Sequence, residues 1–170
     1  SHPDAPCSLP NTFLADPPLD EVQSVSYEVG VRGTYGPLQR YRLGGFLITA
    51  DDDIVFQTTG GVSSNQGFFQ NATDTQRLGV ELELAGGGQN WEWYLNYTWM
   101  EATYESAFFA SSPNNPASVN NKLLVNAGSD IPLLADSNLK FGAAWNVTKA
   151  ITTGFDFRYQ DGVYLRGDEA

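Results

Sequence analysis

The sequence predicts an all-β protein, an antiparallel transmembrane β-barrel that is partial, with about six up-and-down strands, short periplasmic turns and long extracellular loops. Three observations support this fold class. Residues 90–99 alternate without interruption between an apolar, largely aromatic face and a polar face, as expected of a strand with lipid on one side and water on the other. Tight and long connections alternate along the chain, and no run of about 18 apolar residues is present that would indicate a membrane helix.

The first hairpin is predicted from two alternating segments. The first strand covers residues 24–35 and leads through a tight turn at 36–38 into the second strand, residues 40–50. The alternation of the second strand is weak, because Phe46 and Ile48 fall on its polar side. Each strand has about the 9–11 residues that a tilted strand needs to cross a bilayer.

A second hairpin follows a long connection at residues 51–74. Its strands are predicted at 75–85 and, after a glycine turn at 86–88, at 90–99. Another long connection, residues 106–138, is rich in Asn, Ser and Pro. Because the short turns are expected on the periplasmic side, the two long connections are predicted to be extracellular loops.

The third hairpin is predicted from strands at 139–147 and 151–160, joined by a short turn near Lys149. Six strands cannot close a membrane barrel, for which about eight is the usual minimum, so further strands are expected outside this sequence. The chain is therefore predicted to hold a leader in an extracellular loop, residues 1–23, and a partial barrel, residues 24–170.

Composition excludes several function classes. The formal net charge of −11 argues against nucleic-acid binding. Single Cys7 and His2 offer neither a disulfide nor a catalytic dyad or zinc set, and three adjacent aspartates at 51–53 indicate a solvated loop apex rather than a Ca²⁺ site. Glu81 and Glu83 could form a carboxylate pair for hydrolysis, but a place in the barrel lumen explains both. We predict no enzyme activity, catalytic residue, metal site or cofactor.

The alternation divides the candidate functional residues by face. Charged side chains on the polar faces are expected to line the lumen, where they would contact an enclosed domain and each other, or less directly a substrate: Arg32, Arg42, Arg77, Glu81, Glu83, Lys140, Asp156 and Arg158. Amphipathic rings on the apolar faces are expected at the lipid headgroups, in a girdle of Tyr35, Trp91, Trp99 and Trp145. Paired aromatic residues in the long loops are expected to bind substrate or to pack on one another: Phe68, Phe69, Phe108 and Phe109.

Short motifs in the same order resemble those of TonB-dependent outer-membrane receptors. Residues 14–19 followed by Ser26-Tyr-Glu-Val-Gly-Val-Arg-Gly33 resemble a loop and the Tyr-Glu-x-Gly-x-Arg-Gly strand that follows it in that family. Asn65-Gln-Gly-Phe-Phe-Gln-Asn71 and Gly79-Val-Glu-Leu-Glu83 resemble the next hairpin, Asn96-Tyr-Thr-Trp-Met-Glu-Ala102 resembles a following strand, and Arg166-Gly-Asp-Glu-Ala170 resembles the loop before the last strands. Together these motifs span nearly the whole chain.

The resemblance implies a barrel of about 22 strands in the bacterial outer membrane, with a plug domain inside. It implies energised uptake of a scarce solute, most often a ferric siderophore or other iron complex, driven by the TonB complex. The partners implied are outer-membrane lipid, the plug domain, the TonB complex and a small-molecule or metal-chelate ligand. The present sequence lacks the plug, the TonB box and the C-terminal strand of such a receptor.

Two other functions stay open at this point. A passive porin-like barrel would have the same strand pattern and no plug. A secreted β-sandwich could bind carbohydrate through aromatic side chains such as Trp91 and Trp93. Solubility without detergent would favour the sandwich, because a membrane barrel exposes a large apolar band.

Overall fold

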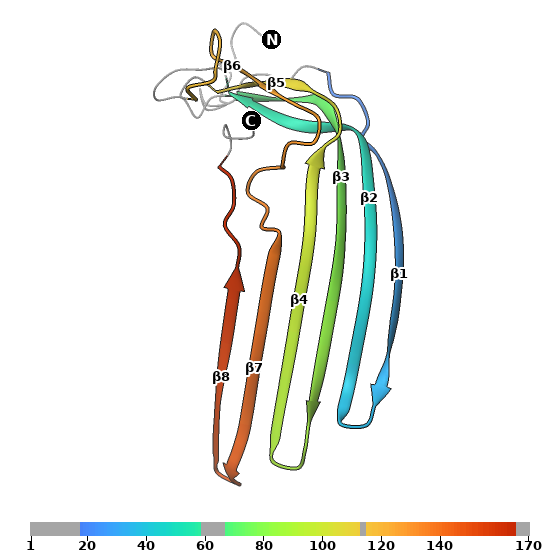
Figure 1. The fold of residues 1–170 in the computed structure, drawn as a ribbon, viewed down its shortest axis with the longest axis vertical. Helices are drawn as coiled ribbons and strands as arrows, with labels where there is room; N and C mark the ends of the chain where they lie inside the picture. The colour runs from blue at the N-terminus through green and yellow to red at the C-terminus, as the bar shows by residue number, and fades with distance from the viewer. Residues whose placement is uncertain (1–17, 59–66, 113–114, 166–170) are drawn as a thin grey trace, which may run out of the picture.

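The computed structural model describes residues 18–58, 67–112 and 115–165. Within these residues it contains a six-stranded antiparallel sheet and a two-stranded hairpin (Figure 1). No helix among the described residues is long and apolar enough to cross a membrane. The predicted all-β fold with six up-and-down strands is confirmed, and the sheet is not closed, since its order is β1-β2-β3-β4-β7-β8.

The strands of the sheet are long, and each pairs with its neighbours in antiparallel fashion. Their bounds are β1 Gln23–Tyr35, β2 Leu38–Thr58, β3 Gly67–Gly87, β4 Trp91–Tyr104, β7 Ser137–Thr148 and β8 Ile151–Gln160. The two-stranded hairpin consists of β5 Phe108–Ser111 and β6 Lys122–Val125. Several expected features lie outside the described residues: Cys7, His2, most of the leader and the motif at 166–170.

The three tight turns lie at one end of the sheet, the lower end in Figure 1, called here the tight-turn end. Gly36, with φ of +55°, and Pro37 join β1 to β2. Glycine suits this position because a side chain is disfavoured in the left-handed region. Between β3 and β4, the Gly88 amide donates a hydrogen bond to the carbonyl of Trp91 at 2.8 Å. The opposite end, which carries the β5–β6 hairpin, is called the hairpin end.

The prediction of a loop at residues 51–74 is wrong, because β2 continues to Thr58 and β3 starts at Gly67. The three aspartates form a bulge in β2 rather than a loop apex. The register with β3 shifts on both sides of Asp53, and Asp52 has φ of 56°. An extra residue in one strand lets the ladder resume beyond the bulge while increasing the local bend. Polar residues that indicated a loop are therefore accommodated within a strand.

The second long connection, residues 106–138, also contains regular structure. Its β5–β6 hairpin is held by a small core of Tyr104, Phe108 and Val125. Residues 126–136 then return along the hairpin end of β4, where the Ile131 amide donates to the carbonyl of Ala102 at 2.9 Å. The edge of β4 beyond the start of β7 is thereby covered.

The cross-strand register divides the predicted site residues between two faces, because residues directly opposite each other in a ladder share a face. The polar face carries all eight predicted lumen residues: Arg32, Arg42, Arg77, Glu81, Glu83, Lys140, Asp156 and Arg158. The apolar face carries the four predicted girdle residues: Tyr35, Trp91, Trp99 and Trp145. The alternation in the sequence therefore assigned each of these side chains to the face on which the structure places it.

Phe46 and Ile48 lie on the polar face, where the weak alternation of this strand placed them. Phe46 pairs with Gly79, and a methyl group at Gly79 would lie 2.4 Å from Phe46 Cζ. The ring thus covers the glycine backbone of the neighbouring strand. This contact accounts for one apolar side chain on an otherwise polar surface, since the missing side chain leaves room for the ring.

The girdle residues mark two levels of the apolar face. Trp91 and Trp145 are direct partners near the tight-turn end, where Tyr35 also lies. Trp99 lies about 26 Å farther along β4, at about 3.3 Å per residue. With strand tilt, this separation is comparable to the apolar band of about 25 Å in membrane barrels.

Leu82 lies on the apolar face of β3 opposite Tyr97, between the levels of Trp91 and Trp99, and Glu81 lies beside it on the polar face. We expect Leu82→Arg in the complete barrel to cost about 2–4 kcal/mol, because it places a charge against hydrocarbon. Glu81→Gln should cost much less. Denaturant unfolding of both variants in lipid vesicles measures the difference, and a larger loss for Glu81→Gln would show that the two faces are reversed.

Candidate functional site

A cavity of about 230 Å³ lies at the hairpin end, where β2, β3 and the β5–β6 hairpin meet. Polar side chains form one part of its wall and aromatic rings form another. Its lining comes from β2, β3, β4, β5 and the segment at 131–132: Asp53, Ile54, Val55, Phe56, Phe69, Thr75, Arg77, Tyr104, Phe108, Ala110, Ser111, Ile131 and Pro132. Arg77 and Thr75 place the cavity against the polar face of the sheet.

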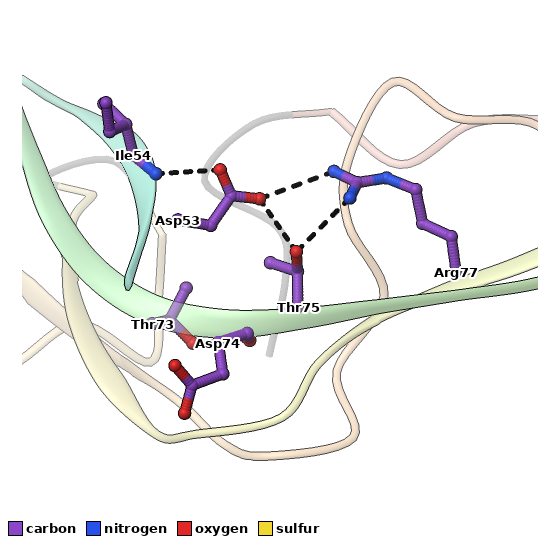
Figure 2. A network of polar contacts seen from close by, with 6 residues as sticks. All are labelled: Asp53, Ile54, Thr73, Asp74, Thr75 and Arg77. Carbon is purple, nitrogen blue, oxygen red and sulfur yellow. Dashed lines mark hydrogen bonds and ion pairs between the residues drawn. The ribbon is translucent and has the colours of Figure 1, made fainter. Parts of the chain in front are cut away.

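Asp53 is the centre of the polar wall (Figure 2). One carboxylate oxygen accepts a hydrogen bond from the Ile54 amide at 2.8 Å, and the other accepts one from the Thr75 hydroxyl at 2.8 Å. Arg77 Nη2 lies 3.5 Å from the same second oxygen, and Arg77 Nη1 donates to Thr75 Oγ1 at 3.3 Å. The bulge at Asp53 is what directs this carboxylate towards β3, so the three side chains form one connected network.

Two pairs of aromatic rings complete the wall. Phe56 and Phe69 are cross-strand partners on β2 and β3 with ring centroids 5.1 Å apart in an edge-to-face arrangement. Tyr104 and Phe108 pack in the same way at 4.9 Å. Edge-to-face packing fixes ring orientation and adds about 0.5–1.5 kcal/mol beyond burial. The cavity is therefore bounded by rings whose positions are set by their partners.

Hydrogen bonds around the cavity hold the surrounding strands in place. The Thr73 hydroxyl donates to the carbonyl of Ser106 at 2.8 Å, and the Asp74 amide donates to the Ser106 hydroxyl at 3.0 Å. The Asn71 amide nitrogen donates to the carbonyl of Asp52 at 2.7 Å and to that of Asp20 at 3.0 Å. These contacts connect β3 to three other segments: the bulge in β2, the residues just before β5 and the segment before β1.

The structure separates the four predicted substrate-binding aromatic residues. Phe69 and Phe108 line the cavity, whereas Phe68 and Phe109, their neighbours in the chain, do not. All four lie on strands, so the prediction that they lie in the long loops is wrong. Phe108 is only 8% exposed and belongs to the small core under the hairpin. Neighbouring residues on a strand point to opposite faces, which explains why only one of each pair reaches the cavity.

Sequence reasoning missed four residues that form the cavity wall: Asp53, Phe56, Thr75 and Tyr104. The continuation of β2 beyond Ala50 was not predicted, because the run of aspartates interrupts the apolar alternation that marks a strand. Residues 54–56 and 68–69 are apolar and flank a glycine-containing stretch, as two strands joined by a loop would. That pattern was the available signal for Phe56.

A second feature of the polar face is a row of mostly charged residues that runs across the six paired strands. Arg32 pairs with Arg42, which pairs with Glu83 on β3. Asn96 continues the row on β4, and Lys140 pairs with Arg158 on β7 and β8. Side chains from all six strands of the sheet thus meet at one level, well separated from the cavity.

The lining of the cavity has the composition of a binding site for a small molecule. Its wall combines apolar rings with a hydrogen-bonded ion pair, the usual composition of a small-molecule site. Among residues 18–58, 67–112 and 115–165, no group of three or more His, Cys, Asp or Glu side chains could hold a metal ion. Its side chains can contact a ligand through ring faces and through the Asp53–Arg77 pair.

The family model described as "TonB dependent receptor-like, beta-barrel" matches residues 5–170, nearly the entire chain. A search of curated proteins found no match.

Thr75 is a test of the polar network, because its side chain is buried and bonded to Asp53. Thr75→Val keeps the shape and removes the hydroxyl, which should cost about 1–2 kcal/mol locally. We expect hydrogen exchange of residues 50–58 to become about tenfold faster in the complete receptor. Thr98→Val on the same face is the matched control, and equal exchange in both variants would contradict the role given to Thr75.

Gly142 on β7 lies under the Tyr94 ring, whose hydroxyl donates to Asp156 on β8 at 2.5 Å. A methyl group at Gly142 would lie 2.5 Å from Tyr94 Cε1 and 2.7 Å from Asp156 Oδ1. Gly142→Ala should therefore destabilise the barrel by about 1–3 kcal/mol through overpacking. Denaturation in lipid vesicles measures this loss. Gly44→Ala should lack this effect, because the nearest atom to its methyl group would be 3.8 Å away.

Proposed function

Because the chain belongs to the TonB-dependent receptor-like β-barrel family, we propose that it forms part of the barrel of a receptor that imports a ferric siderophore or other iron complex. The protein is an outer-membrane protein of Gram-negative bacteria, and its family carries out TonB-dependent transport. Members work with a plug domain and the TonB complex. The family consists of transporters, and we assign no catalytic step to this chain.

The two faces of the sheet support a definite orientation. We assign the polar face to the lumen and the apolar face to lipid, because charged side chains in hydrocarbon are costly and aromatic rings suit the headgroup level. The tight-turn end is then periplasmic and the hairpin end extracellular. The outer edges of β1 and β8 are unpaired within the described residues, so other strands of the receptor would complete the barrel. The division into a leader, 1–23, and a barrel segment, 24–170, stays a prediction.

The cavity at the hairpin end is the observation that supports ligand capture. In the proposed orientation it faces the extracellular side, where a solute first meets the receptor. Iron chelates present flat oxygen-donor groups and often a net negative charge. The rings of Phe56 and Phe69 can pack on such groups, and Arg77 can offer hydrogen-bond donors to anionic oxygens. A cavity of about 230 Å³ would enclose one arm of a chelate rather than the whole molecule.

The alternatives from the sequence receive less support. The family match favours an energised receptor over a passive porin. A carbohydrate-binding β-sandwich requires a second sheet packed face to face on the first. In the described part of the chain, the only other sheet is the short β5–β6 hairpin, which lies at one end.

Uptake of radioactive iron tests the proposed substrate class. The complete receptor is expressed in iron-starved cells that lack their own iron receptors, and a ferric catecholate, a ferric hydroxamate and ferric citrate are supplied in turn. We expect uptake of at least one chelate that depends on the receptor and stops when TonB is deleted. Receptor-dependent uptake of cobalamin or a glycan, with none of any iron chelate, would overturn the iron proposal and leave the family membership intact.

Phe69 provides a sharper test of the cavity. Phe69→Ala should weaken binding of the transported chelate to outer-membrane vesicles about tenfold, because it removes one ring of the wall. Phe109→Ala removes an equally large exposed ring that does not line the cavity, and should change binding little. Equal losses in both variants would show that the cavity is not the capture site.

A further inference from the structure

Charged side chains are distributed unevenly along the strands. The register places Val29, Gly45, Val80, Trp99 and Ser137 at one level, which divides the sheet into a hairpin part and a tight-turn part. Among residues 18–58, 67–112 and 115–165, the carboxylates at this level or beyond it towards the hairpin end are Asp20, Glu21, Glu28, Asp51, Asp52, Asp53, Asp74, Glu101, Glu105, Asp130, Asp136 and Asp161. The cations of the same part are Arg77 and Lys122.

The tight-turn part has the opposite balance. In the described part of the chain its carboxylates are Glu81, Glu83, Glu92 and Asp156, and its cations are Arg32, Arg40, Arg42, Lys140, Lys149 and Arg158. The net negative charge of the described residues therefore comes from the hairpin part, which also holds the cavity.

The cavity itself carries a balanced pair of charges. Of the described residues that line it, Asp53 and Arg77 alone are charged, and they form an ion pair with each other. Within the part of the chain that the structure describes, no ion pair is recorded for the other carboxylates of the hairpin part. Hydrogen bonds from neutral groups, such as that from the Thr103 hydroxyl to Glu105 at 2.8 Å, leave the carboxylate charge in place.

Four of these carboxylates are direct chain neighbours of residues in the cavity wall. They are Asp52, Asp74, Glu105 and Asp130, next to Asp53, Thr75, Tyr104 and Ile131. Consecutive Cα atoms are about 3.8 Å apart, so the four charges lie within roughly one Debye length of the wall, about 8 Å at physiological ionic strength. Clustered charges of one sign raise the local concentration of solutes of the opposite sign and lower that of solutes of the same sign.

The aromatic part of the wall favours the same sign of ligand charge. The face of an aromatic ring carries partial negative charge and attracts a cation. Phe56 and Phe69 form one pair of rings in the wall, and Tyr104 and Phe108 form the other. Neither the rings nor the balanced ion pair offsets the negative charge around the cavity.

We propose that the receptor selects iron chelates by charge, taking neutral or cationic chelates such as ferric tris-hydroxamates in preference to anionic ferric tris-catecholates and ferric citrate. This inference rests on the proposed function and narrows its substrate class. Three hydroxamates, each with a single negative charge, balance the charge of ferric iron, whereas three catecholates, each with two, leave the chelate anionic. The iron-bound oxygens of a hydroxamate can still accept hydrogen bonds from Arg77. The surrounding carboxylates repel a chelate with net negative charge.

One chelate in three charge states tests this selection. A linear tris-hydroxamate with a free amine is cationic when loaded with iron, its N-acetyl form is neutral and its N-succinyl form is anionic, while the iron site stays the same. Binding of the radioactive ferric forms to outer-membrane vesicles with and without the complete receptor is measured at low and high ionic strength. We expect the cationic form to bind about tenfold more tightly than the anionic form at low ionic strength. The difference should narrow at high ionic strength.

Glu105 and Asp130 test the origin of the preference, because both are exposed and neither lines the cavity. Glu105→Gln combined with Asp130→Asn removes two negative charges, and should narrow the difference between the cationic and anionic forms about threefold. Glu105→Asp combined with Asp130→Glu keeps both charges and is the matched control, which should bind as the unaltered receptor does. Heat-modifiable migration on a gel establishes that each barrel has formed.

Equal binding of the three forms, or tightest binding of the anionic form, would overturn charge selection and leave the iron proposal intact. The same holds if the three forms fail to bind while a ferric catecholate or ferric citrate is taken up. An unchanged preference after removal of the two charges would show that these carboxylates do not set it. Receptor-dependent uptake of no iron chelate at all would overturn the iron proposal itself, so the two failures are distinguishable.

Discussion

The antiparallel hydrogen-bond ladder is the constraint on which the rest of this structure depends. In hydrocarbon, each backbone amide and carbonyl group must be paired within the protein, because no water replaces a lost partner. The ladder fixes a register, and the register sorts every side chain onto one of two faces. A shift of β2 by one residue relative to β3 would move Arg42 onto the apolar face while Glu83 stayed on the polar face. The charged row, the girdle and the polar wall of the cavity all require the same register.

Departures from the regular ladder occur at the hairpin end, and they create the candidate site. The bulge at Asp53 shifts the register of β2 and directs a carboxylate towards Thr75 and Arg77. Beyond it, the strands bend beneath a small apolar core that includes Tyr104 and Phe108. The two ends of the sheet therefore differ, with tight turns at one end and a bulged strand and a covered cavity at the other.

The features that the sequence predicted correctly are the strands and faces that follow from alternation between neighbouring residues. Residues 90–99 and 75–85 alternate cleanly, so their strands and faces were predicted correctly. The continuation of β2 was missed because the polar run at 51–53 resembles a loop, and only pairing with residues 71–75 makes a bulge favourable there. The cavity was missed for a related reason. Phe56 and Phe69 come together through the pairing of residues 13 positions apart, which the alternation within either segment does not report.

Lipid contact along β4 tests the central claim that the apolar face meets the membrane. A spin label is attached to single cysteines at each position from 92 to 99 of the complete receptor, with Cys7 replaced by Ser. Collision with oxygen, which concentrates in lipid, should be high at 93, 95, 97 and 99 and low at the even-numbered positions. A polar nickel reagent should give the opposite pattern where the lumen is accessible. Equal oxygen accessibility at odd and even positions, or a reversed pattern, would contradict the account.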